Sequence, residues 1–262
     1  MKQEILSALG NHPWAETLQY HNCVESTNDL AKVLADGGAP HGTVIIAGKQ
    51  TRGRGRMGRT FQSPADSGIY LSVVLRPDCK ADKLMHLTCA TGVAMCNAVE
   101  TATGYRPGIK WINDLVACNR KLGGILTELS LAQDGGVRYA VVGIGINCHQ
   151  KEFSGELETI AISLDVATGK RTSRAALAAA MIAQLEIMSR FLLTEKAAVM
   201  EQYRRDCVTL GREVTLLRAE QTVSATAIGL DEDGGLLVRY KDGSCGTVAT
   251  GEVSVRGLFG YC

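Results

Sequence analysis

Two sequence patterns follow one another along this chain of 262 residues. Up to about residue 205, apolar runs of strand length alternate with segments whose apolar residues recur at helical spacing. From Gly211 to Arg256, short alternating strands are separated by Asp-Gly and Gly-Gly turns. The first pattern indicates an α+β domain and the second a small β-barrel. We therefore predict two domains, residues 1–205 and residues 206–262.

The α+β pattern predicts a short leader with a little helix, followed by alternating strands and helices. The predicted strands are residues 17–24, 43–47, 68–75, 109–112, 115–117, 125–131 and 137–147. The predicted helices are residues 28–35, a long helix capped by Asp82 with its apolar positions between Leu84 and Val99, residues 165–168 and residues 173–203. Ser26 or Thr27 is the expected cap of the first of these helices, and Ser173 of the last.

Composition places the chain among ordinary globular proteins. Its formal net charge is +1, so no global charge draws it toward nucleic acid or anionic membranes. The nine cysteines are scattered, with no Cys-x-x-Cys pair and no accompanying histidine cluster, which argues against a zinc site and for a reducing compartment. The N-terminus lacks the apolar run of a signal peptide, and no apolar stretch reaches membrane-spanning length. We expect a cytoplasmic protein with no membrane partner.

A local concentration of positive charge follows the predicted strand at residues 43–47. Between Arg52 and Arg59 the chain carries four arginines and three glycines in eight positions. Glycine lets the backbone approach a ligand closely, and arginine presents a permanently charged fork to carboxylate or phosphate. The segment Gln50–Arg59 therefore suits an anion that must be wrapped and released. A solvated basic loop and an Arg-Gly nucleic-acid patch are the alternatives, although no Arg-Gly repeat supports the second.

Four further polar segments lie at predicted strand ends or connections: residues 26–28, 110–114, 121–125 and 143–147. Taken singly, each has an ordinary structural explanation, such as a helix cap, a turn, a hairpin connection or a bulged strand end. Side chains at strand ends can nevertheless converge on one pocket. Together with the basic loop they supply cations, a carboxylate suited to Mg²⁺ and glycines. That set fits activation of a carboxylic acid by ATP, with a closing loop that shields the mixed anhydride from water.

The same segments carry a family resemblance. The ordered motifs ESTNDLA (25–31), QTRGRGRMGR (50–59), GIYLSVVLRP (68–77), KWINDL (110–115), RKLGGILTEL (120–129), VVGIGINC (141–148) and GEVSVR (251–256) resemble those of the biotin protein ligases. The resemblance covers nearly the whole chain from about residue 17. It implies a mixed β-sheet with packed helices, the class II synthetase-like fold of biotin and lipoate ligases, followed by an SH3-like barrel. Lipoate ligases resemble this fold distantly, but their arginine-rich and Gly-Gly-Gly motifs are absent here.

The resemblance implies a two-step reaction that uses biotin, ATP and Mg²⁺. Biotin is activated to biotinyl-5'-AMP with release of pyrophosphate, and biotin is then transferred to a lysine of a biotin carboxyl carrier protein. Some members of the family carry a DNA-binding domain ahead of the ligase. Only about 25 residues precede Ser26 here, so we expect no DNA binding. A homodimer is left open.

Roles for individual residues also come from the resemblance. It implies that the catalytic residues are Arg56, Lys110, Asp114 and Lys121. The implied biotin-binding residues are Ser26, Thr27, Asn28, Gln50, Arg54, Gly55, Arg56, Lys121, Gly124 and Gly143. The implied ATP-binding residues are Arg54, Arg56, Arg59, Lys110, Asn113, Lys121 and Asn147. Asp114 is the implied Mg²⁺ ligand, and it is also expected to orient or deprotonate the incoming lysine.

Two positions depart from the family pattern. Ile112 stands where the family usually has Pro, and Phe61 where it usually has Trp. Ile112 is expected to loosen the approach to Asn113 and Asp114 slightly. Phe61 should keep an aromatic surface, although with less area and without the indole donor. Neither change removes a charged group that the chemistry needs.

Overall fold

A seven-stranded mixed sheet organises the first 206 residues of the computed structural model, which describes residues 1–218, 221–249 and 252–255. The spatial order of the strands is β1-β2-β3-β7-β6-β5-β4; β1 and β2 are parallel and every other pair is antiparallel. The strands are β1 Leu18–His21, β2 Thr43–Ala47, β3 Gly68–Leu75, β4 Gly108–Lys110, β5 Asp114–Ala117, β6 Arg120–Leu131 and β7 Val137–Asn147.

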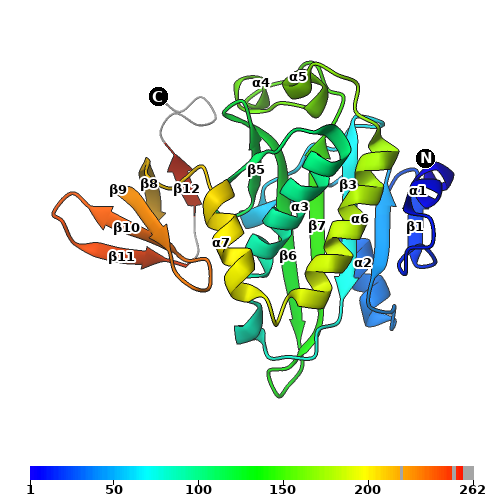
Figure 1. The fold of residues 1–262 in the computed structure, drawn as a ribbon, viewed down its shortest axis with the longest axis horizontal. Helices are drawn as coiled ribbons and strands as arrows, with labels where there is room; N and C mark the ends of the chain where they lie inside the picture. The colour runs from blue at the N-terminus through cyan, green and yellow to red at the C-terminus, as the bar shows by residue number, and fades with distance from the viewer. Residues whose placement is uncertain (219–220, 250–251, 256–262) are drawn as a thin grey trace.

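Helices cover both faces of this sheet (Figure 1). The helical elements are α1 Lys2–Leu9, α2 Thr27–Asp36, α3 Leu87–Thr103, α4 Leu157–Ile160, α5 Leu164–Thr168, α6 Arg174–Phe191 and α7 Lys196–Asp206, with 3₁₀ turns η1 Arg56–Gly58 and η2 Ala81–Leu84. Helices α3 and α6 cross the front of the sheet in Figure 1, and α2 packs against β2, β3 and β7 on the other face. None of the helices in the described residues is long and apolar enough to cross a membrane.

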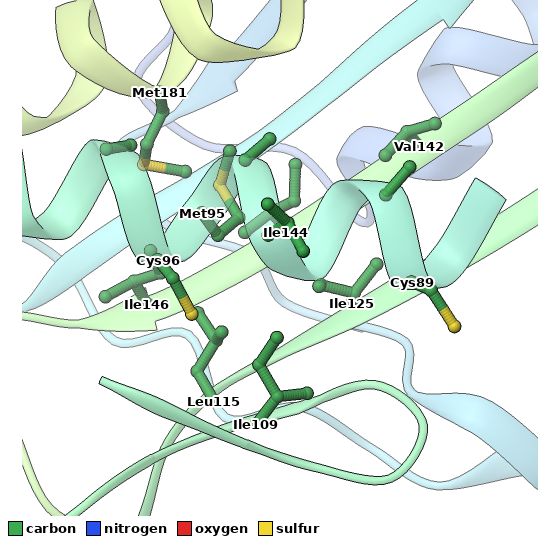
Figure 2. Close-up of a cluster of buried hydrophobic side chains, with 14 of the residues drawn as sticks. Cys89, Met95, Cys96, Ile109, Leu115, Ile125, Val142, Ile144, Ile146 and Met181 are labelled. Carbon is green, nitrogen blue, oxygen red and sulfur yellow. The ribbon is translucent and has the colours of Figure 1, made fainter. Parts of the chain in front are cut away.

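The two-sided cover explains why the central strands are apolar throughout. In β2, Val44 and Ile46 belong to the core beneath α3 and α6, whereas Ile45 belongs to the smaller core beneath α2. Alternate side chains of a strand point to opposite faces, so a strand covered on both sides buries every residue. Figure 2 shows the larger core, where α3 presents Met95 and Cys96 toward strand residues such as Ile144.

Most of the elements expected from the sequence are present. β2, β3 and β7 have the predicted bounds, and β1 and β5 lie within or overlap their predicted ranges. The Ser26 side chain caps α2 by accepting from the backbone N–H of Asp29, and the Ser173 side chain caps α6 in the same way at Ala176. These predictions are confirmed because apolar runs and cap residues are local signals.

Three predictions about element boundaries are wrong. Asp82 does not cap the long helix, because it lies in η2, and α3 begins only after His86. The single helix predicted over residues 173–203 is two helices, α6 and α7. β6 begins at Arg120 rather than at Ile125, since the turn before it is made by Cys118 and Asn119, both with positive φ. A short 3₁₀ turn shares the apolar spacing of a helix, so spacing alone did not separate them.

The strand predicted at residues 109–112 is β4, which ends at Lys110. The Trp111–Ile112 peptide that follows is cis. The carbonyl of Ile112 accepts a hydrogen bond from the hydroxyl of Tyr203 at 3.1 Å. The approach to Asn113 is therefore supported from α7.

The C-terminal part of the chain forms a second, antiparallel sheet. Its strands are β8 Glu213–Arg218, β9 Gln221–Leu230, β10 Leu236–Tyr240, β11 Cys245–Val248 and β12 Glu252–Val255, in the order β11-β10-β9-β8-β12. β11 and β12 lie at opposite edges, so the sheet is not a closed barrel in the described residues. The SH3-like barrel stays a prediction. The strand predicted at residues 252–256 is β12, with Arg256 outside the described residues. The boundary between residues 205 and 206 stays a prediction.

Trp111 joins the two sheets. Its backbone N–H donates to Thr209 Oγ1 at 2.9 Å, and its indole N–H donates to the carbonyl of Gly234 at 2.7 Å. Trp111 is 4% exposed and Thr209 is fully buried, so water does not compete for these bonds. Thr209, which precedes β8, and Gly234, in the turn between β9 and β10, therefore hold the chain that leads into Asn113 and Asp114.

Replacing Thr209 by valine should destabilise the protein, because the substitution keeps the shape but leaves the N–H of Trp111 without an acceptor. We expect the free energy of unfolding, measured by urea denaturation, to fall by about 1–3 kcal/mol. Thr247→Val makes the same change at an exposed position of β11 and should alter it by less than about 0.5 kcal/mol. Equal effects in the two variants would show that the Trp111–Thr209 bond does not hold the sheets together.

Candidate active site

A cavity of about 730 Å³ lies where β5, β6, β7 and α2 meet the segment Gln50–Arg59, which we call the basic loop. Every residue for which the sequence predicted a role lines this cavity. They are Ser26, Thr27, Asn28, Gln50, Arg54, Gly55, Arg56, Arg59, Lys110, Asn113, Asp114, Lys121, Gly124, Gly143 and Asn147. The segments quoted from the sequence therefore converge, as expected for side chains at strand ends and connections.

The first turn of α2 forms one end of the cavity. The Ser72 hydroxyl, on β3 and fully buried, lies 2.8 Å from Thr27 Oγ1 and 2.7 Å from Asn28 Oδ1. Gln50 Oε1 accepts from both the backbone N–H of Thr27, at 2.8 Å, and its hydroxyl, at 3.0 Å. Gln50 Nε2 in turn donates to Ser63 Oγ at 2.8 Å. This end of the cavity is thus a fixed array of hydroxyl and amide groups.

The orientation of the Asn28 amide is set by its acceptors. Its Nδ2 donates to the carbonyl of Leu126 at 3.3 Å and to Glu128 Oε2 at 2.9 Å, which leaves Oδ1 facing Ser72. The amide lies directly over Gly143, where a Cβ atom would overlap Asn28 Oδ1. A residue with a side chain at position 143 would therefore clash with the polar network.

Within the basic loop, Arg54 is paired with acids. It lies 2.7 Å from Asp29 Oδ1 and 3.1 Å from Glu128 Oε1, and Lys32 contacts the same two carboxylates at 2.9 and 3.1 Å. Burial alone would raise the pKa of Asp29, but its hydrogen bonds and ion pairs with Lys32 and Arg54 outweigh burial and lower that pKa below its usual value. The positive charge of Arg54 is therefore balanced by carboxylates of the protein itself.

Arg56 has a different environment. It donates to Asn113 Oδ1 at 3.0 Å, and no carboxylate in the described part of the chain forms an ion pair with it. Arg56 thereby connects the basic loop to the β4–β5 turn with a neutral partner, and its positive charge is available to an anion in the cavity.

The charged cluster at the other end of the cavity is centred on Asp114. Lys121 Nζ lies 2.8 Å from Asp114 Oδ1, and Asn113 Nδ2 lies 3.3 Å from the same oxygen. Asp114 on β5 is paired in register with Lys110 on β4 and with Gly124 on β6. The side chains of Asp114 and Lys121 lie over Gly124.

The cluster could hold Mg²⁺ only together with a ligand. Among the described residues no group of three or more His, Cys, Asp or Glu side chains could hold a metal ion. Mg²⁺ is, however, usually bound by one or two carboxylates, waters and substrate phosphates rather than by a protein cage. Asp114, inside the cavity beside Asn113, fits that mode.

One wall of the cavity was not predicted from the sequence. It consists of Phe153, Ser154, Gly155, Glu156, Leu157, Ile160 and Ala161, around α4. The wall is tied to the site because Ile162 N donates to the carbonyl of Lys121 and Asn147 Nδ2 donates to the carbonyl of Ile162. No local motif marks these residues, so only their position in the fold identifies them.

Phe61 also lines the cavity and lies over Gly145, where a Cβ atom would overlap its ring. Its ring meets that of Tyr70 edge to face, with centroids 6.4 Å apart. The aromatic surface expected at this position is present.

Two family models match the chain. Residues 20–147 match the Biotin/lipoate A/B protein ligase family, and residues 209–256 match the Biotin protein ligase C terminal domain. The Bifunctional ligase/repressor BirA of Bacillus subtilis is 34% identical over 92% of this chain and 75% of its own length. The Biotin--[acetyl-CoA-carboxylase] ligase of Mycobacterium tuberculosis is 32% identical over 80% of this chain and 79% of its own length.

Solved structures are similar as well. The biotin protein ligase from Aquifex aeolicus, in complex with biotin and ATP, has a TM-score of 0.77 and 30% identity. That match covers 91% of this chain and 98% of the other. The biotin protein ligase of Leishmania major bound to biotinyl-5-AMP, at 24% identity and a TM-score of 0.61, shows the same fold.

Substituting Gly143 by alanine should disturb the Asn28 amide, because the added methyl group takes the place of Oδ1. We expect the free energy of unfolding to fall by about 1–3 kcal/mol, since buried hydrogen bonds to Ser72 and Glu128 are lost. In an Asn28→Ala background the methyl group meets no amide, so the same substitution should cost clearly less. A double-mutant cycle by urea denaturation measures this coupling. Additive costs would contradict the proposed overlap.

Proposed function

The chain belongs to the biotin protein ligase family, and we propose on that basis that it is an ATP-dependent biotin protein ligase. It activates biotin to biotinyl-5'-AMP with release of pyrophosphate and then transfers biotin to a lysine of a biotin carboxyl carrier protein. The observation that carries the proposal is the division of one cavity into a neutral hydrogen-bonding end and a cationic end.

The neutral end suits the ureido ring of biotin, which offers one carbonyl acceptor and two N–H donors. Thr27, Asn28 and Gln50 present hydroxyl and amide groups there that are already held by Ser72 and Ser63. Groups fixed in this way lose little conformational freedom when a ligand binds. Ser26 contributes mainly as the cap of α2, because its hydroxyl accepts from the N–H of Asp29.

The cationic end suits two anions that must meet. The carboxylate of biotin attacks the α-phosphorus of ATP, the bond from that phosphorus to the bridging oxygen breaks, and pyrophosphate leaves. Lys121, Arg56 and Lys110 line this end and would offset the repulsion between carboxylate and phosphate. Asp114 would hold Mg²⁺ with the phosphates, and this ion would supply further positive charge. The apolar side chains of Phe153, Leu157 and Ile160 offer a surface for the adenine.

In the second step the amine of the acceptor lysine attacks the acyl carbon and AMP leaves. Asp114 is the group in the cavity that would orient or deprotonate this amine, because its carboxylate pairs with the ammonium of Lys121 in this structure. The basic loop would act as a lid over the adenylate until the acceptor arrives. A cytoplasmic location and the absence of DNA binding stay predictions, and a homodimer stays open.

The proposal predicts biotin-dependent exchange of labelled pyrophosphate into ATP in the presence of Mg²⁺. Lys121→Gln should slow this exchange by about 10²-fold or more, because one cation at the reacting groups is lost. Lys170→Gln removes an exposed lysine and should leave the rate unchanged. No exchange with biotin would refute the proposed function. Exchange with lipoate instead would show that the enzyme activates lipoate rather than biotin.

Arg56→Gly tests the role of the loop after activation. We expect the variant to form the adenylate but to release it, because the loop loses its bond to Asn113 and its charge over the anion. Released adenylate should label lysines of a bystander protein such as serum albumin. Arg52→Gly, which removes an arginine that pairs with the exposed Glu25, should retain the adenylate. A variant at Arg56 that binds biotin normally yet forms no adenylate would contradict this role.

A further inference from the structure

Glu128 lies on β6, outside the lining of the cavity, and contacts three groups at once. Its Oε2 accepts from Asn28 Nδ2 at 2.9 Å, and its Oε1 lies 3.1 Å from Arg54 and 3.1 Å from Lys32. The side chain is 23% exposed, so these contacts are partly shielded from water. One carboxylate therefore touches both the neutral end of the cavity and the basic loop.

The two contacts have different chemistry. Asn28 is neutral, and it requires an acceptor that keeps its amide turned with Oδ1 toward Ser72. Arg54 is a cation on the loop, and it requires a negative charge. Asp29 contacts Arg54 at 2.7 Å and Lys32 at 2.9 Å, but its side chain makes no hydrogen bond to Asn28. The two acids therefore share the loop contact, whereas only Glu128 also holds the amide.

We propose that Glu128 is a positioning residue that couples biotin recognition by Asn28 to closure of the basic loop through Arg54. The proposal rests on the function proposed above. When biotin engages the Asn28 amide, the same carboxylate that fixes this amide also anchors the loop over the ligand. Arg54 is then an anchor of the loop rather than a ligand of the phosphates, and Arg56 is the loop arginine that faces the anion.

Three substitutions separate the two contacts. Glu128→Gln keeps an oxygen that can accept from Asn28 but removes the charge that holds Arg54. Glu128→Ala removes both. Asp29→Asn removes the other acid from Arg54 and leaves the contact between Glu128 and Asn28 intact. Glu201→Gln makes the same change of charge on the exposed surface of α7, where Glu201 pairs with Arg205, and serves as the matched control.

The experiment measures two quantities for each variant: the KM for biotin in pyrophosphate exchange, and the rate at which labelled biotinyl-adenylate leaves the enzyme without acceptor. Glu128→Gln and Asp29→Asn should release the adenylate at least about threefold faster, with the KM for biotin within twofold of the parent. Glu128→Ala should show faster release and a KM raised by about tenfold. Glu201→Gln should change neither quantity, and thermal melting verifies that each variant is folded.

Two results would overturn the proposal. One is an unchanged KM in the folded Glu128→Ala variant, because Asn28 would then not depend on Glu128. The other is unchanged release in Glu128→Gln, because the loop would then not be anchored by the charge. Failure of the proposed function is separate from both, since the parent protein itself would then show no exchange with biotin.

Discussion

The hydrogen bonds around the Asn28 amide are the constraint on which the rest of the site depends. Asn28 lies at the start of α2, is 4% exposed, and joins β3 through Ser72 and β6 through Glu128. Its amide fills the space above Gly143 on β7. A buried amide without partners would cost about 1–3 kcal/mol, so these elements must stay in register for the network to form. The sheet and α2 thereby fix the neutral end of the cavity before any ligand binds.

Charge is distributed unevenly over the basic loop. Arg54 is balanced by Asp29 and Glu128, whereas among the described residues Arg56 donates to the neutral amide oxygen of Asn113 and forms no ion pair. At the far end of the cavity Lys121 is paired with Asp114. A biotin carboxylate and the phosphates of ATP therefore meet Arg56, for which the described residues supply no acidic partner, and Lys121, whose partner Asp114 can turn to Mg²⁺ or to an acceptor amine. This arrangement favours the binding of anions.

Local sequence signals predicted much of this structure. β2, β3 and β7 were predicted with their observed bounds because strands covered on both faces are continuous apolar runs. β6 was predicted to start late, since Gly123 and Gly124 resemble a turn, yet Gly123 is a strand residue whose missing side chain lets it approach Gly145. The residues that were given a role from the sequence all line the cavity. Glu128 and the wall around α4 were given no role, because their roles arise from contacts with distant parts of the chain.

Hydrogen exchange of the backbone amides in residues 50–62 and at the start of α2 tests the coupling between biotin and the loop most directly. Calorimetry on the same sample establishes that biotin is bound. The account predicts that bound biotin slows exchange in both segments, because Asn28, Glu128 and Arg54 connect them. Bound biotin with unchanged exchange in residues 50–62 would contradict it, because the loop would then close independently of biotin recognition.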